Sequence, residues 1–464
     1  MAWRLRGTGS SGFALRMTTK VVTLIQIRGC GAAHGEDVAS LATAAAMNRA
    51  PIPIAPFART DAATPSFIAV FAAAPHRLMF FAGASAVLLS MLWWTLALAA
   101  GVLGWTHWPQ APIPAIWAHA MLAQYGMLGP FILGFLLTVF PRWTGQRELR
   151  RGAYVPVFAG VFGGYLLALS GLLDLRPLLV LGFALMLGGW IYGCARLFGV
   201  LRAARSRDRW AWSILAALTL GALGLALFLA VLMGAPGALA IAAIRLGTFG
   251  FLLPVYFSVI HRMLPFFSAN VIADYRTVRP TWSLPLLWVL LLAHLGFDFA
   301  GLPMWRALID ALLALFFLGH WIAWQPWKAR RPGLLAVLYL AFAWLPLAFA
   351  LFALGGLRGE GAYGVLDMAA LHALTVGFFG SMLVAMVTRV THGHSGRPLA
   401  MGAIPWFTFL AVQAVALARV IDALAGGGAL AYTLTAVAWV AAFLPWALRS
   451  AWIYLTPRRD GRPG

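Results

Sequence analysis

The chain has 464 residues, of which 62% are hydrophobic and 10% are charged, and its formal net charge is +21. Soluble globular domains average roughly 45–50% apolar and about 25% charged residues, so this composition leaves too little polar surface for a water-soluble enzyme of this size. The positive charge alone could suggest nucleic-acid binding, but the basic residues do not alternate with segments able to form a soluble domain. We therefore expect no nucleic-acid partner.

The first 74 residues differ from the rest of the chain. They contain Arg4, Arg6, Arg16, Lys20 and Arg28, followed by a stretch rich in Pro and Ala. The apolar run at 21–25 is too short for the core of a signal peptide. We predict that residues 1–74 form a disordered cytoplasmic tail, and Met47 is an alternative start. Cys30 and Cys194 are too few for a disulfide framework or a cysteine-ligated cluster.

From residue 75 the chain is a series of long apolar segments, each near the 20 or so residues that a membrane-spanning helix needs. Twelve such segments occur at 78–104, 117–140, 154–173, 177–199, 210–233, 239–264, 282–300, 304–324, 333–354, 366–390, 401–424 and 429–454. They are rich in Leu, Ala, Gly and Phe without strict alternation, which favours helices over β-barrel strands. We predict an all-α polytopic membrane bundle of about twelve transmembrane helices at 75–456, with a cytoplasmic tail at 457–464.

The basic residues between these segments predict the orientation. The loops after even-numbered segments carry Arg142, Arg147, Arg150, Arg151, Arg202, Arg205, Arg207, Arg209, Arg276, Arg279, Lys328, Arg330, Arg331 and Arg397. The loops after odd-numbered segments contribute only Arg176, Arg306 and Arg358. Because cytoplasmic loops are enriched in Lys and Arg, we predict a bacterial inner-membrane protein with both termini in the cytoplasm.

Two histidines inside the apolar segments are the first candidates for function, because ionisable side chains are costly within a membrane. His119 lies near the start of the second segment and His372 near the start of the tenth, so both are expected at a similar depth toward the outer face. If these helices are neighbours, the two imidazoles could bind a haem iron from both sides. Each could also be an ordinary hydrogen-bonded residue of the bundle, since spacing does not show which helices touch.

Other ionisable residues offer further, separate candidates. Arg245, within the sixth segment, could pair with a haem propionate or with Asp310, or its side chain could extend to the outer surface. His294, near the outer end of the seventh segment, could be a second metal ligand. His394, which with His392 lies in the loop after the tenth segment, could also bind a metal, although two donors do not complete a site.

Several short motifs resemble those of the NnrS family and are spread over residues 75–400. They are Pro75-His76-Arg77-Leu78, Gly134-Phe135-Leu136-Leu137-Thr138, Pro141-Arg142-Trp143-Thr144-Gly145, Arg262-Met263-Leu264-Pro265-Phe266-Phe267, Leu371-His372-Ala373-Leu374-Thr375-Val376-Gly377, Met386-Val387-Thr388-Arg389-Val390 and Gly393-His394-Ser395-Gly396-Arg397-Pro398-Leu399. The resemblance implies a polytopic membrane protein that contains haem b and copper. It also implies a role in nitric oxide metabolism or in resistance to nitrosative stress.

The second segment departs from this family pattern. The family's usual motif is His-Ala-His-Glu-Met, whereas this chain has Trp117-Ala118-His119-Ala120-Met121. A metal role for the missing His and Glu cannot be carried over, so a bis-histidine haem is expected more than a copper site. The plan is also similar to the main subunit of haem-copper oxidases, whose low-spin haem is held by histidines of helices 2 and 10. The sixth segment lacks an HxxxY-type motif, and a binuclear centre is not expected.

Two other functions stay open. Twelve helices with both ends in the cytoplasm are a common layout of secondary transporters, but those proteins usually show internal repeats, and residues 78–264 and 282–454 are not convincingly similar. The second is an assembly factor for a respiratory complex, and co-purification of a partner protein would support that function. We expect the lipid bilayer and nitric oxide, or a related small molecule, as the partners.

Overall fold

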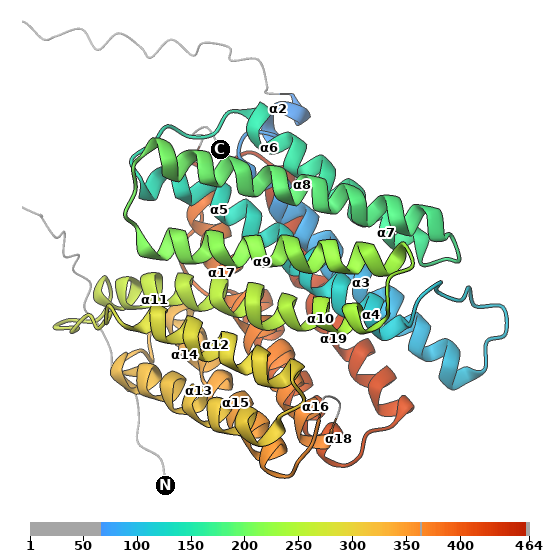
Figure 1. Cartoon of the computed structure of the whole chain (residues 1–464). Coiled ribbons are helices and arrows are strands. Elements are labelled where there is room, and N and C mark those ends of the chain that lie inside the picture. The colour runs from blue at the N-terminus through green and yellow to red at the C-terminus, as the bar shows by residue number, and fades with distance from the viewer. Residues whose placement is uncertain (1–65, 362–363, 461–464) are drawn as a thin grey trace, which may run out of the picture. The chain divides into compact units, whose positions relative to one another are not determined.

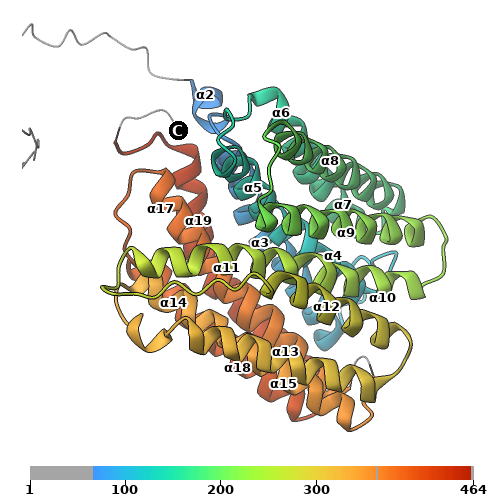
Figure 2. The same cartoon turned by 60° about the vertical axis from the view of Figure 1, so that its left-hand side comes forward.

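A computed structural model describes residues 66–361 and 364–460 of the chain. Within this part the regular elements are all helical, and long helices lie side by side in one bundle (Figure 1). Figure 2 shows the same bundle from a second direction. Eleven of the described helices are long and apolar enough to cross a membrane, which confirms the predicted all-α polytopic membrane bundle. Most of the predicted tail, including Met47, lies outside the described residues.

The chain folds into the following elements. In order, they are α2 (Phe67–Phe71), α3 (Pro75–Leu103), α4 (Ala115–Met121), η1 (Leu122–Leu128), α5 (Gly129–Trp143), α6 (Arg151–Phe158), η2 (Ala159–Gly163), α7 (Gly164–Gly171), α8 (Arg176–Ala203), α9 (Arg209–Leu232), α10 (Ala238–Arg245), η3 (Leu246–Leu252), α11 (Leu253–Ala269), α12 (Ser283–Phe299), α13 (Pro303–Ala323), η4 (Pro326–Lys328), α14 (Gly333–Phe342), α15 (Trp344–Leu357), α16 (Val365–His372), η5 (Ala373–Gly380), α17 (Ser381–His394), α18 (Ala403–Leu424) and α19 (Ala429–Leu455). Each predicted apolar segment corresponds to helix, with ends that agree to within a few residues.

The seventh predicted segment is the exception in length. It forms α12, which has 17 residues, whereas the other predicted segments belong to helical stretches of at least 21 residues. At a rise of 1.5 Å per residue, α12 is about 26 Å long, less than the roughly 30 Å of a bilayer's hydrocarbon core. The structure therefore supports eleven full-length spans, and the twelfth stays a prediction.

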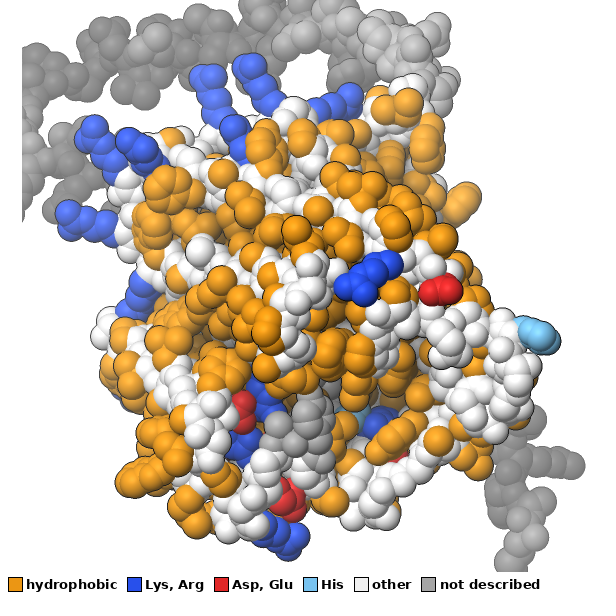
Figure 3. Space-filling model, turned by 45° about the vertical axis from the view of Figure 1, so that its right-hand side comes forward, with side chains coloured by type: hydrophobic (Ala, Val, Ile, Leu, Met, Phe, Trp, Pro, Cys, Tyr) orange, Lys and Arg blue, Asp and Glu red, His pale blue; other side chains and the backbone are white. Residues whose placement is uncertain are grey.

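The two ends of the bundle differ in charge. We call the end that holds the start of α3 and the ends of α5, α11, α17 and α19 the basic end, and the other the opposite end. Loops at the basic end carry most of the arginines outside the helices. Figure 3 shows Lys and Arg side chains gathered toward one end of the visible face, beside a broad hydrophobic surface. This separation is the one expected of a protein that crosses a membrane repeatedly.

Glycines let one pair of neighbouring helices pack backbone against backbone. A Cβ on Gly164 would lie 2.6 Å from the carbonyl oxygen of Gly182, and a Cβ on Gly189 would lie 2.8 Å from the backbone nitrogen of Val161. Close approach at small residues is a common way for helices to associate in a bilayer, where apolar side chains gain little by leaving lipid. The stretch from α6 to α7 is thereby held directly against α8.

Replacing Gly189 by Leu should destabilise this helix pair, because backbone atoms that cannot move aside occupy the space its side chain needs. We expect a loss of about 1–3 kcal/mol, seen as a lower melting temperature of the purified protein in detergent. Gly188→Leu is the matched control, since a Cβ at Gly188 meets nothing within 4 Å. Equal melting temperatures for the two variants would contradict the packing described.

Three of the most buried spans contain a stretch of π-helix. The segments η1, η3 and η5 follow directly on α4, α10 and α16, in the second, sixth and tenth predicted spans. Pro130 and Pro254 stand at the second position of the α-helical stretches after η1 and η3. Proline has no N–H to donate to the preceding turn, so a locally wider helix accommodates it. Such π-helical turns often mark functional sites.

Candidate functional site

The three main site residues predicted from the sequence occupy equivalent places in the structure. His119 lies two residues before the end of α4, Arg245 is the last residue of α10, and His372 is the last residue of α16. Each therefore stands at the junction between an α-helical start and the π-helical segment that follows it. All three lie toward the opposite end of the bundle.

The imidazole of His372 is oriented from both sides. Its Nδ1 donates a hydrogen bond to the carbonyl oxygen of Met368, 2.7 Å away, and its Nε2 accepts one from Nη2 of Arg419 at 3.0 Å. A carbonyl oxygen only accepts and a guanidinium only donates, so the proton of the neutral ring is on Nδ1 and the lone pair is on Nε2. Metal-binding histidines are commonly oriented by a hydrogen bond of this kind from the other ring nitrogen.

Arg419 of α18 is a site residue that the sequence analysis missed. Its Nη1 pairs with Asp422 at 2.7 Å, and its guanidinium carbon lies 4.2 Å from the centre of the Tyr432 ring. These contacts hold the guanidinium beside His372. The signal that could have found it is the one that singled out Arg245, namely a charged residue within an apolar segment.

His119 lies close to this pair. Its ring stacks on that of Trp94, with ring centres 4.4 Å apart and planes inclined by 19°. Neither of its ring nitrogens has a hydrogen-bond partner among the described residues. His119 is near enough to His372 and Arg419 for electrostatic interaction with both. We call His119, His372 and Arg419 the histidine site.

Arg245 belongs to a second group of buried charges next to this site. It pairs with Asp298 at 2.8 Å, and the other oxygen of Asp298 accepts a hydrogen bond from Nη1 of Arg306 at 3.0 Å. Arg306 also binds both oxygens of Asp367, at 2.8 and 2.6 Å. Asp367 precedes His372 by five residues on the same helix, so this group also holds the helix that carries His372.

His294 and Asp310 complete this group, which we call the buried charge network. The Nδ1 of His294 donates to Asp310 at 2.6 Å, and the second oxygen of Asp310 lies 3.6 Å from Nε of Arg306. The Nε2 of His294 has no hydrogen-bond partner and its side chain is fully buried. Two guanidinium groups thus face three carboxylates within the bundle.

The chain matches the family model described as NnrS protein over residues 70–458. The chain belongs to the NnrS family. No curated protein matches it at a significant level.

In this NnrS protein, motif segments that are distant in sequence meet at the basic end. The ring centres of His76 and His394 are 4.3 Å apart, and the guanidinium carbon of Arg262 lies 4.1 Å from the centre of the Trp143 ring. His394 is thus beside His76, whereas His392 accepts a hydrogen bond from Arg449 at 3.0 Å. Among the described residues there is no group of three or more His, Cys, Asp and Glu side chains able to hold a metal ion.

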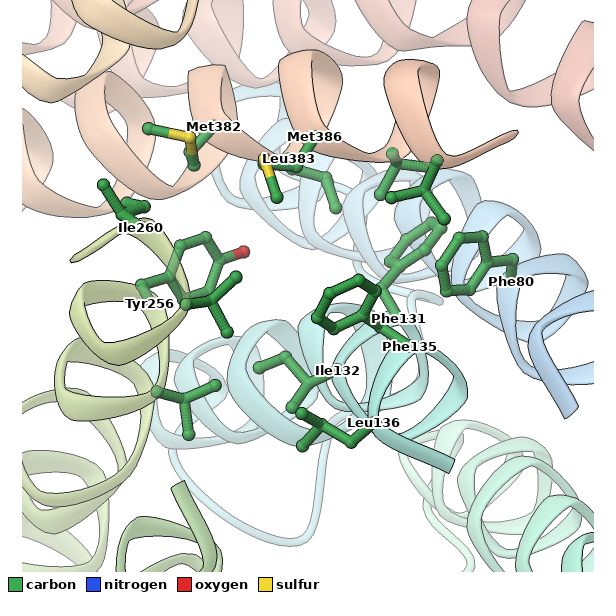
Figure 4. A pocket seen from close by; sticks show the side chains of 14 residues that line it. Phe80, Phe131, Ile132, Phe135, Leu136, Tyr256, Ile260, Met382, Leu383 and Met386 are labelled. Atoms are coloured by element: carbon green, nitrogen blue, oxygen red, sulfur yellow. The ribbon is translucent and has the colours of Figure 1, made fainter. Parts of the chain in front are cut away.

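An apolar pocket with about 70 Å³ of accessible space lies between α3, α5, α11 and α17 of the NnrS bundle (Figure 4). Phe80, Phe131 and Phe135 line one part of it, and Met382 and Met386 another. The hydroxyl group of a single tyrosine is the one polar side-chain group in this lining. The pocket has room for a very small apolar molecule.

Removing one charge of the buried charge network should destabilise this NnrS protein. In Asp367→Asn, Arg306 loses its bidentate carboxylate partner in a place without water, and we expect a loss of about 3–5 kcal/mol in the free energy of unfolding. The measurement is the melting temperature in detergent. Asp174→Asn, at an exposed loop position, is the control and should change it little. Equal melting temperatures for the two variants would show that Asp367 does not stabilise the fold in this way.

Proposed function

We propose that this NnrS-family protein binds haem b in the membrane and acts in nitric oxide metabolism or in resistance to nitrosative stress. The observation that carries the proposal is the hydrogen bond from Nδ1 of His372 to Met368, which leaves the Nε2 lone pair of His372 as the ring's donor atom. His119, whose ring nitrogens have no protein partner, lies within electrostatic reach. Neutral imidazoles are suitable axial ligands for haem iron.

In this proposal, each residue of the histidine site has its own role in binding the haem. His119 and His372 would bind the iron, and Arg419, which contacts His372, would pair with a propionate. Arg245 remains a candidate for that role, but its carboxylate partner in the structure is Asp298. Bound haem would supply an iron centre to which nitric oxide can bind when one axial position is open.

Arg419 also has a role of its own in this proposal. Its hydrogen bond to Nε2 of His372 uses the lone pair that a metal would need. Arg419 keeps Asp422 and the ring of Tyr432 as partners when that bond is broken. Its guanidinium is therefore free to turn toward an acidic group without becoming an unpaired buried charge.

The test is the absorption spectrum of the full chain, purified from cells supplied with haem. We expect Soret and α bands of a b-type haem, and their loss in His119→Ala and in His372→Ala, because each variant removes one iron ligand. His107→Ala, at an exposed position of the loop between α3 and α4, should keep the full spectrum. A wild-type chain without these bands, or a His372→Ala variant that keeps them unchanged, would refute the proposal.

We also propose that the basic end faces the cytoplasm of a bacterial inner membrane, which puts both termini there. The support is the concentration of loop arginines at the basic end, where the described chain also begins and ends. A fluorescent protein fused after Gly464 should fluoresce, and alkaline phosphatase fused there should be inactive. Alkaline phosphatase inserted after Leu103 should be active; the reverse pattern would invert the orientation.

A further inference from the structure

Five arginines gather at the basic end of the bundle. They are Arg77 at the start of α3, Arg397 in the loop after α17, Arg449 near the end of α19, and Arg458 and Arg459 just beyond α19. Arg77 is within electrostatic reach of Arg458 and Arg397, and Arg397 of Arg459 and Arg449. We call these five residues the arginine basin.

The chain beyond α19 folds back to build this basin. Nη2 of Arg77 donates hydrogen bonds to the carbonyl oxygens of Tyr454 and Thr456, at 2.7 and 2.5 Å. The backbone N–H of Arg459 donates to the carbonyl oxygen of Ser395 at 3.2 Å. Three segments from opposite parts of the sequence are thus held together by hydrogen bonds, so the basin is a defined structure.

The arginine basin contains far more positive than negative charge. Arg458 pairs with Asp460, with N–O distances of 2.9 and 2.6 Å. No carboxylate other than Asp460 pairs with any of the five arginines among the described residues. The nearby Glu148 is paired with Arg142 at 2.9 Å. Within the described part of the chain, the mutual repulsion of these five guanidinium groups is therefore largely uncompensated.

Two of these guanidinium groups also have buried N–H donors without a partner. They are Nε of Arg77, whose side chain is almost fully buried, and Nη1 of Arg397. Burial lowers the pKa of Arg397, and the charges of Arg459 and Arg449 lower it further. An unpaired donor on a buried charged group is costly, and an anion bound in the basin would remove that cost.

We propose that the arginine basin binds a phosphate group at the membrane surface, that of an anionic phospholipid or of free phosphate. The planar fork of a guanidinium matches phosphate oxygens, and arginine is preferred where a phosphate is bound by paired hydrogen bonds. The basin lies where helices of a membrane bundle end, at the level of lipid head groups, and basic pockets between such helices bind acidic head groups. This inference does not depend on haem binding.

The experiment measures phospholipid retained by the full chain after purification in a mild detergent. We expect native mass spectrometry to show bound phosphatidylglycerol in preference to phosphatidylcholine when both are added in equal amounts. Arg459→Gln should weaken this binding about fivefold, the effect of one lost arginine near a lipid phosphate. The side chain can be lost without breaking the fold, since it is the backbone N–H of Arg459 that bonds Ser395.

Two further variants and a second probe make the test decisive. Arg397→Gln should weaken binding at least as much, while Arg207→Gln, an exposed arginine elsewhere at the basic end, should leave it unchanged. Inorganic phosphate alone is titrated against the melting temperature; stabilisation by phosphate but not by phosphatidylglycerol would assign the site to free phosphate. Failure of both probes to bind, or equal binding by Arg459→Gln and Arg207→Gln, would overturn the proposal.

Discussion

The absence of water in a bilayer is the constraint on which this structure depends, because each polar group within it must find a partner in the protein. The carbonyl of Ile244, at the start of the π-helical stretch of α10–η3, shows how this is met. It accepts hydrogen bonds from the amide of Gln124 at 2.9 Å and from the hydroxyl of Thr248 at 3.1 Å. The bond from Gln124 comes from the π-helical stretch of another span. Irregular helix geometry is thus tolerated where side chains satisfy the backbone.

The same constraint explains the two groups of charges near the opposite end. Arg306 and Asp367 would each be costly alone in this position, and together they tie α13 to α16. His372 stands at the other end of α16, so the position of its imidazole depends on that ion pair. The buried charge network therefore helps to fix the helix that carries His372. At the arginine basin, buried N–H donors of arginine have no partner in the protein, and this is the observation from which we infer a bound anion.

The sequence predicted more of the fold than of the site. The predicted segment 210–233 is the helix Arg209–Leu232, and the common depth of His119 and His372 was also predicted from the segments. Arg419 and Asp367, which contact or support His372, were not predicted. The ends of the helices that carry these two residues were predicted to within a few residues. Hydropathy does not show which neighbouring side chains a residue on such a helix contacts. Apolar residues surround these helices on most sides, so periodicity does not show which face meets which neighbour.

Hydropathy along the chain determined where its apolar helices lie, because a bilayer selects residues by depth alone. The depth of each residue in the bilayer can therefore be inferred from the order of apolar and charged residues. The lateral arrangement is decided by packing, glycine contacts, ion pairs and hydrogen bonds between segments far apart in sequence, such as the bonds from Arg77 to Tyr454 and Thr456. Only the tertiary structure could bring Arg419 to His372, place Asp298 rather than a distant group beside Arg245, and assemble five arginines at the basic end.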